Sequence, residues 1–128
     1  MKIAKLSFAL VIAVLAIGVS VAANANKLGK RTITACYEVV LLQNSANSAT
    51  YAPAQTDLAS FVNTQVVTNQ IKFLKQAPST INDVCNETDR FCCAIFTEAP
   101  AGTPATVPNV TIGAVTAKWV VQSIKLHN

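Results

Sequence analysis

Four cysteines carry the most distinctive chemistry in this chain of 128 residues. Cys36 stands alone, Cys85 follows much later, and Cys92 and Cys93 are adjacent. No Cys-x-x-Cys motif occurs, so the spacing is not typical of a redox-active dithiol. Zinc sites commonly place their ligands as two close pairs, which a single early cysteine does not supply. The even count in a small domain therefore predicts disulfide bonds, and plain buried thiols are the alternative.

The positions of the cysteines also favour one pairing over the others. A bond between Cys92 and Cys93 would strain the ring that adjacent residues form. In an extended strand neighbouring side chains point to opposite faces, so these two cysteines are expected to have different partners. The six residues 86–91 can form a tight loop, which brings Cys85 to Cys92. The expected bonds are therefore Cys85 to Cys92 and Cys36 to Cys93.

Groups for acid–base or nucleophilic catalysis are scarce. His127 is the one histidine and lies next to the C-terminus, where chains usually fray, so a Ser-His-Asp site would lack a positioned base. Asp83, Glu87 and Asp89 crowd one turn without the spacing of an EF-hand loop. A glycine-rich phosphate loop and a G-x-S-x-G motif are missing. We therefore expect a protein that is not an enzyme, with no catalytic residue, metal site or cofactor.

The first 25 residues have the three parts of a cleavable secretory signal peptide. A short basic stretch precedes an apolar run over residues 6–21, and a small-residue exit follows at Ala23-Asn24-Ala25. Signal peptidase accepts small residues at the last and third-last positions, so cleavage after Ala25 would leave Asn26 as the first residue. Cleavage after Ala23 is the near alternative, and an uncleaved membrane anchor is the other.

Cleavage would leave residues 26–128 as one small exported domain. Lys2 and Lys5 would leave with the signal, so eight basic and six acidic residues would remain, with a net charge of about +2. The basic residues are scattered, whereas a nucleic-acid binder needs a dense basic face. We therefore expect no nucleic-acid partner, and no stable membrane span after signal cleavage.

Apolar periodicity predicts several strands in the mature chain. Residues 32–43 alternate apolar and polar side chains over much of their length and are rich in Thr, Val, Ile and Leu. Residues 44–55 are small and polar and contain proline, which indicates a loop. Residues 91–96 form an apolar strand pattern, and residues 110–126 contain two further β-rich pieces around Gly113.

Residues 56–77 fit neither the helical nor the strand period throughout. Thr56 can cap a short helix over residues 57–63, with Leu58, Phe61 and Val62 on its apolar side. Beyond this helix the apolar residues spread around the helical wheel, while Thr and Val favour extended structure. A strand is therefore predicted over residues 70–74.

These elements predict a small, mainly-β, disulfide-stapled domain of five or six strands with one short helix. A sandwich or open barrel is expected, because either architecture buries the apolar faces of half-polar strands. Trp119 and Tyr37 are expected in the core, since large rings on strands bury much apolar area. Tyr51 lies in the polar loop and is expected to be exposed.

The segment CNETDRFCCAIF, together with the early Cys36 and the Ala-x-Ala exit, resembles a group of short exported proteins from Bacteroidetes-type bacteria. In that group a turn flanked by cysteines precedes a small apolar strand. The adjacent Cys92 and Cys93 depart from the pattern. The group has no established activity, so the resemblance implies a bacterial envelope or secreted location and no mechanism.

The expected function is that of a non-enzymatic exported protein which acts through its surface as an envelope, matrix or interaction component. Its partner would be a protein or another surface, and its location secreted, periplasmic or in the cell envelope. A small secreted effector, toxin-like protein or enzyme inhibitor is the alternative, and an inhibitor would present the turn between Cys85 and Cys92. Asn86 and Asn109 begin N-glycosylation sequons, which matter only in a host that modifies them.

Overall fold

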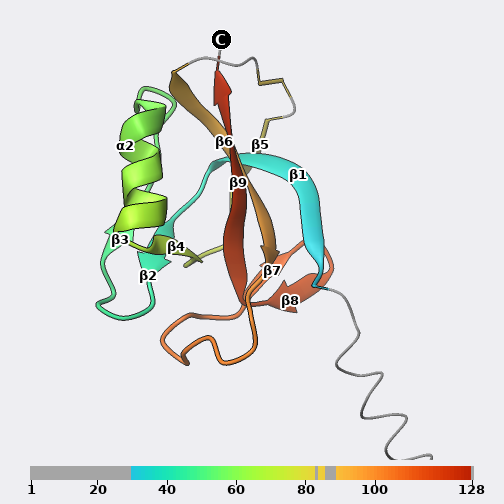
Figure 1. Ribbon diagram of the computed structural model, residues 1–128. Coiled ribbons are helices and arrows are strands. Elements are labelled where there is room, and N and C mark those ends of the chain that lie inside the picture. The colour runs from blue at the N-terminus through green and yellow to red at the C-terminus, as the bar shows by residue number, and fades with distance from the viewer. Residues whose placement is uncertain (1–29, 83, 86–88, 128) are drawn as a thin grey trace, which may run out of the picture.

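Two long antiparallel strands form the centre of the computed structural model (Figure 1). They are β6 (Arg90–Glu98) and β9 (Trp119–His127), and both are rich in the aromatic and β-branched residues that suit a pleated, half-buried surface. Their pairing extends from Arg90 opposite His127 to Glu98 opposite Trp119. On its other side β6 pairs with β1 (Thr32–Val39). These three strands contain the predicted apolar strand of residues 91–96 and most of the predicted first strand.

The structure describes residues 30–82, 84–85 and 89–127. The predicted signal peptide, residues 1–25, and its cleavage residues Ala23, Ala25 and Asn26 lie outside the described residues. The described part is mainly β with one short helix, as the sequence predicts. No helix within it is long and apolar enough to cross a membrane.

The main sheet has seven strands in the order β3-β2-β4-β9-β6-β1-β5. Its shorter members are β2 (Leu42–Asn44), β3 (Thr50–Tyr51), β4 (Ile71–Leu74) and β5 (Thr80–Ile81). A separate two-stranded hairpin joins β7 (Val110–Ile112) to β8 (Val115–Ala117), and Gly113 takes the left-handed φ of +60° in its turn. The described residues therefore contain more strands than the five or six predicted.

The predicted strand over residues 32–43 is two strands, β1 and β2, which lie far apart in the sheet order. In a flat sheet the three strands between them would separate β1 from β2 by about 19 Å. The chain from Val39 to Leu42 spans at most about 11 Å. The sheet therefore has to curl, and it forms the half barrel seen in Figure 1. This is the open-barrel form of the predicted architecture.

The helix begins two residues later than the sequence predicts, at Ala59, and a π-helical stretch follows it. α2 (Ala59–Asn63) is followed directly by one π-helical stretch, η1 (Thr64–Thr68), which the sequence pattern does not predict. β4 comes next and confirms the strand predicted over residues 70–74. Thr56 does not cap the helix: the N-cap is Leu58, without a side-chain hydrogen bond. The reason is that Leu58 forms a β-bridge with Arg90, which keeps this part of the chain extended.

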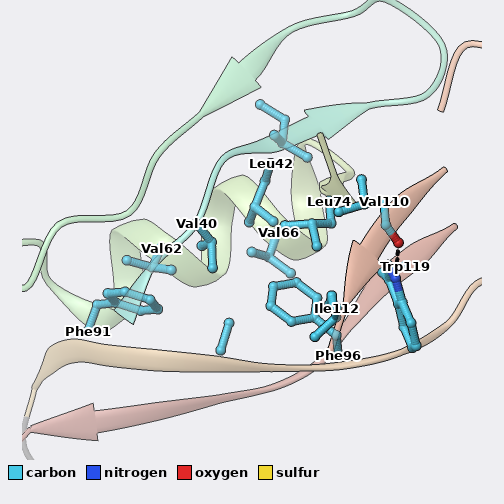
Figure 2. Packing of buried hydrophobic residues seen from close by; sticks show 12 residues of the cluster. Val40, Leu42, Val62, Val66, Leu74, Phe91, Phe96, Val110, Ile112 and Trp119 are labelled. Atoms are coloured by element: carbon cyan, nitrogen blue, oxygen red, sulfur yellow. Dashed lines mark hydrogen bonds between the residues drawn. The ribbon is translucent and has the colours of Figure 1, made fainter. Parts of the chain in front are cut away.

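A single main core joins the helical segment to the concave sheet. Val62 and Val66 of the helical segment pack in one cluster with Phe91 and Phe96 of β6 (Figure 2). Trp119 is completely buried in the same cluster, and its indole Nε1 donates a hydrogen bond of 2.8 Å to the carbonyl of Val110. The predicted core position of Trp119 is confirmed, and this bond ties the β7–β8 hairpin to the start of β9.

Several side chains differ from their predicted exposure. Leu58 and Phe61, which were expected on the apolar side of the helix, are 46% and 50% exposed. Tyr37 is half-buried against the ring of Phe96, with 6.4 Å between the ring centroids. Tyr51 is also half-buried and not exposed, because its ring packs edge-on against Phe61 at 5.7 Å.

Candidate functional site

The four cysteines form two disulfide bonds, Cys36 to Cys93 and Cys85 to Cys92. The Cα atoms of the two pairs are 5.4 Å and 5.9 Å apart, within the range of disulfide-linked residues. These are the two pairs that the sequence predicts. Together with Ile95 they form a second, smaller apolar cluster.

The geometric reason for this pairing differs from the predicted one. Cys92 and Cys93 do not need opposite faces of a regular strand, because both are fully buried in the same cluster. The register of β6 against β9 shifts between Phe91 and Cys93, which makes Cys92 part of a β-bulge. The Sγ atoms of Cys85 and Cys93, which belong to different bonds, are 3.0 Å apart. The bulge therefore brings both disulfides into contact.

The sulfur atoms of Cys36, Cys85 and Cys93 lie within 4.8 Å of one another, a spacing that three metal ligands could have. Zinc binds cysteine as a thiolate, however, and a sulfur in a disulfide does not offer one. The cluster is therefore a structural staple. It links β1, β6 and the segment that follows β5.

The acidic turn and His127 are described only in part. Asp83, Glu87 and the sequon residue Asn86 lie outside the described residues, and so does much of the turn that an inhibitor would present. Asp89 is exposed, and its backbone carbonyl accepts a hydrogen bond from the N–H of Ala59 at 2.6 Å. His127 is the last residue of β9.

A groove of about 600 Å³ lies between the helical segment and β9, and we call it the α2–β9 groove. Its volume falls within the range of sites that hold ligands in proteins. The helical wall is formed by Ala59, Ser60, Asn63, Val66, Val67 and Gln70. The strand wall is formed by Val121, Gln122, Ser123, Ile124 and Leu126, and β4 contributes Lys72.

The strand wall exists because β9 is longer than its neighbour β4. These two antiparallel strands pair at Phe73 and Val120, and β4 begins at Ile71. Beyond this point β9 pairs with β6 on one side, and no described strand covers its other side. Figure 1 shows the helical segment on the same side of β9 as β4.

Asp57 positions the beginning of the helical wall. Its carboxylate accepts hydrogen bonds from the hydroxyl of Tyr51 at 2.6 Å and the backbone N–H of Ala54 at 2.9 Å. Its backbone carbonyl accepts one from the N–H of Phe91 at 3.0 Å, which attaches this segment to β6. The bond from Ala54, and then that from Tyr51, lowers the pKa of the Asp57 carboxyl. Burial, and then the nearby Asp57 carboxylate, raises the pKa of Tyr51.

The far end of the helical wall has unusual backbone geometry. η1 ends with the N–H of Asn69 donating to the carbonyl of Thr64 at 3.0 Å, and Gln70 follows with a left-handed φ of 56°. The side chain of Gln70 donates back to the carbonyl of Val67, and the side chain of Asn44 donates to the carbonyl of Asn69 at 2.6 Å. π-helical turns and non-glycine residues with positive φ are enriched at functional sites. Both features border the α2–β9 groove.

The described lining of the groove combines apolar side chains with uncharged polar groups and one cation, Lys72. These side chains can make apolar contacts and hydrogen bonds with a ligand. Sequence reasoning did not find this site, because its two walls come from residues 59–72 and 121–126. The apolar residues beyond Asn63 that fit no helical stripe were the available signal, since Val67 belongs to the groove.

A second depression of about 360 Å³ is lined by residues 98–103, Asn109 and residues 116–118. The ammonium group of Lys118 donates here to the carbonyls of Thr103 at 3.0 Å and Pro104 at 2.7 Å. Lys118 therefore serves to hold the loop between β6 and β7. Comparisons of the chain with protein-family models, with curated proteins and with solved structures found no match.

Proposed function

We propose that this chain is an exported, non-enzymatic binding protein that holds a partner in the α2–β9 groove. The observation that carries the proposal is the groove itself, a hollow of about 600 Å³ with apolar, uncharged polar and cationic side chains in its walls. Such mixed linings are typical of sites in which apolar contacts supply affinity and a few polar groups fix orientation. The protein would act as an envelope, matrix or interaction component.

Export is supported by two independent features. The N-terminal residues have the pattern of a cleavable signal peptide. The two disulfides suit an oxidising compartment, where such bonds persist. Both features support a secreted, periplasmic or envelope location.

The proposal is tested by a matched pair of surface variants in the native host. Val67, in the groove, and Ile81, on β5 at the far edge of the sheet, are 57% and 56% exposed, so arginine can replace either without disturbing the core. Fractionation should show that Val67→Arg moves the protein from the envelope or its partner complex into the free fraction. Ile81→Arg should behave like wild type.

Equal distribution of the two variants would reject the groove as the functional surface. Toxicity of the purified protein to neighbouring cells, unchanged by Val67→Arg, would favour the effector alternative over the binding role.

A further inference from the structure

We infer that the α2–β9 groove receives an extended peptide segment of a partner protein, which adds a strand to the uncovered side of β9. This inference rests on the proposed binding function and names the chemistry of its partner. The groove lies between a helix and one side of a strand that no described strand covers, a geometry in which a peptide can gain both backbone hydrogen bonds and side-chain pockets.

The residues that line the strand wall show that the groove follows the edge of β9. Successive side chains of a strand point to opposite faces of its sheet, so a hollow over one face would touch every second residue. The register of β9 against β6 skips Gln122, so this residue forms a β-bulge where alternation does not hold. Beyond the bulge the lining still contains two adjacent residues, Ser123 and Ile124. The groove therefore exposes the strand's backbone side, where alternate N–H and C=O groups point away from β6.

An extended peptide can pair the backbone hydrogen-bonding groups on this edge of β9, whereas a helix or an acyl chain cannot. A helix bonds its backbone internally, and an acyl chain has no hydrogen-bonding groups along its length, so either would cover the polar groups of β9 without pairing them. A peptide strand pairs them and places alternate side chains against the apolar wall residues Val67, Ile124 and Leu126. The uncovered segment from Ser123 to His127 accommodates about five peptide residues.

Charge indicates what the peptide carries at one end. Lys72 is half-buried at the β4 end of the groove and forms no ion pair with another described residue. Continuing the register of Phe73 with Val120 by one residue places Lys72 opposite Val121. With no acidic side chain in the described lining, the groove complements an Asp, a Glu or a chain-terminal carboxylate at that end.

The test begins with a phage-displayed library of random heptapeptides, selected on the disulfide-intact secreted protein. Selected peptides should alternate apolar residues and carry an acidic residue near one end. N-methylation at every second backbone position, where the peptide N–H faces β9, should weaken binding about tenfold for each bond lost. N-methylation at the intervening positions should leave the dissociation constant within about twofold.

Variants of the protein then locate the peptide. Val67→Arg should abolish binding, and Ile81→Arg should preserve it. Lys72→Glu should weaken binding about tenfold and should recover it when the acidic residue of the peptide is replaced by lysine. On addition of peptide, amide exchange should slow in β9 between Ser123 and Lys125.

The outcomes separate this inference from the proposed function. Binding that depends on Val67 but tolerates N-methylation at every position would overturn strand addition and leave the groove as a binding site. A library that yields no binder sensitive to Val67→Arg would overturn the peptide inference. The proposed binding function would then still be tested by the fractionation experiment. A dimer that forms without peptide and is broken by Val67→Arg would assign the groove to a second copy of the chain and overturn the inference.

Discussion

Phe73 and Val120 face each other across β4 and β9, and the sheet divides just beyond this pair. On one side of the division β9 continues to His127, and on the other the chain of β4 leads back through Gln70 into η1. The helical segment lies on the β4 side of β9, and the α2–β9 groove separates the two. The length difference between two neighbouring strands thus creates the candidate site.

The disulfide from Cys36 to Cys93 should stabilise the protein more than the one from Cys85 to Cys92. The first bond closes a loop with a sequence separation of 57 and the second a loop of 7. The loss of unfolded-state entropy gives about 4 kcal/mol for the long loop and about 2.5 kcal/mol for the short one. Urea unfolding of the paired alanine variants Cys36→Ala/Cys93→Ala and Cys85→Ala/Cys92→Ala measures both contributions.

Replacement in pairs matters for this experiment, because a single variant would leave a thiol beside an intact bond and permit exchange. The sulfur atoms of Cys85 and Cys93 are only 3.0 Å apart. A smaller loss of stability for the Cys36 and Cys93 pair than for the other pair would contradict the entropic ranking. Peptide mapping without reductant should recover the same two pairs.

Asp57 should make folding sensitive to acid. Its folded pKa is lowered, so it stabilises the protein fully above its unfolded value of about 3.9, and this contribution is lost as pH falls below that value toward the folded pKa. Asp57→Asn should therefore unfold more easily than wild type at pH 7. The difference should shrink by pH 3, as measured by urea titration at both pH values.

Tyr51→Phe is the matched control for the acid effect. It keeps the edge-on ring contact with Phe61 and removes only the hydroxyl that donates to Asp57. We expect it to cost about 1 kcal/mol at neutral pH and to retain part of the acid sensitivity, because Ala54 still donates to the carboxylate. Identical acid profiles for wild type and Asp57→Asn would rule out this role of Asp57.

Trp119→Phe should loosen the β7–β8 hairpin selectively. The variant keeps an aromatic ring in the core but removes the indole donor to the Val110 carbonyl. The combined loss of volume and hydrogen bond should cost about 2–3 kcal/mol. Phe96→Leu, also at a fully buried position, removes volume without a hydrogen bond and serves as control. Amide exchange in β7 and β8 should accelerate in Trp119→Phe and not in Phe96→Leu.

The secreted protein should begin at Asn26. Loss of residues 1–25 follows from the Ala23-Asn24-Ala25 exit, and intact mass spectrometry of the exported material determines the new N-terminus. A mass that corresponds to cleavage after Ala23 would move the site by two residues and keep the export prediction. Recovery of the full chain from membranes as the dominant species would replace the signal with an anchor.

Local sequence was sufficient for the features whose physical causes are local. The apolar pattern of residues 91–96 predicted β6, Trp119 was correctly expected in the core, and the short spacing of Cys85 and Cys92 indicated their bond. A strand pattern reports which residues can bury one face, and a short loop closes by itself. Neither requires knowledge of the remaining chain.

Only the tertiary structure determined the features that depend on contacts between strands distant in sequence. Residues 32–43 look like one strand, but the curl of the sheet divides them into β1 and β2, and the bridge of Leu58 to Arg90 delays the helix past Thr56. The groove was outside the reach of sequence reasoning for the same reason. Val67 and Ile124 line the same groove only because β4 does not extend alongside the C-terminal half of β9. The length over which two strands pair is set by the packing of the whole sheet and not by the local pattern of either segment.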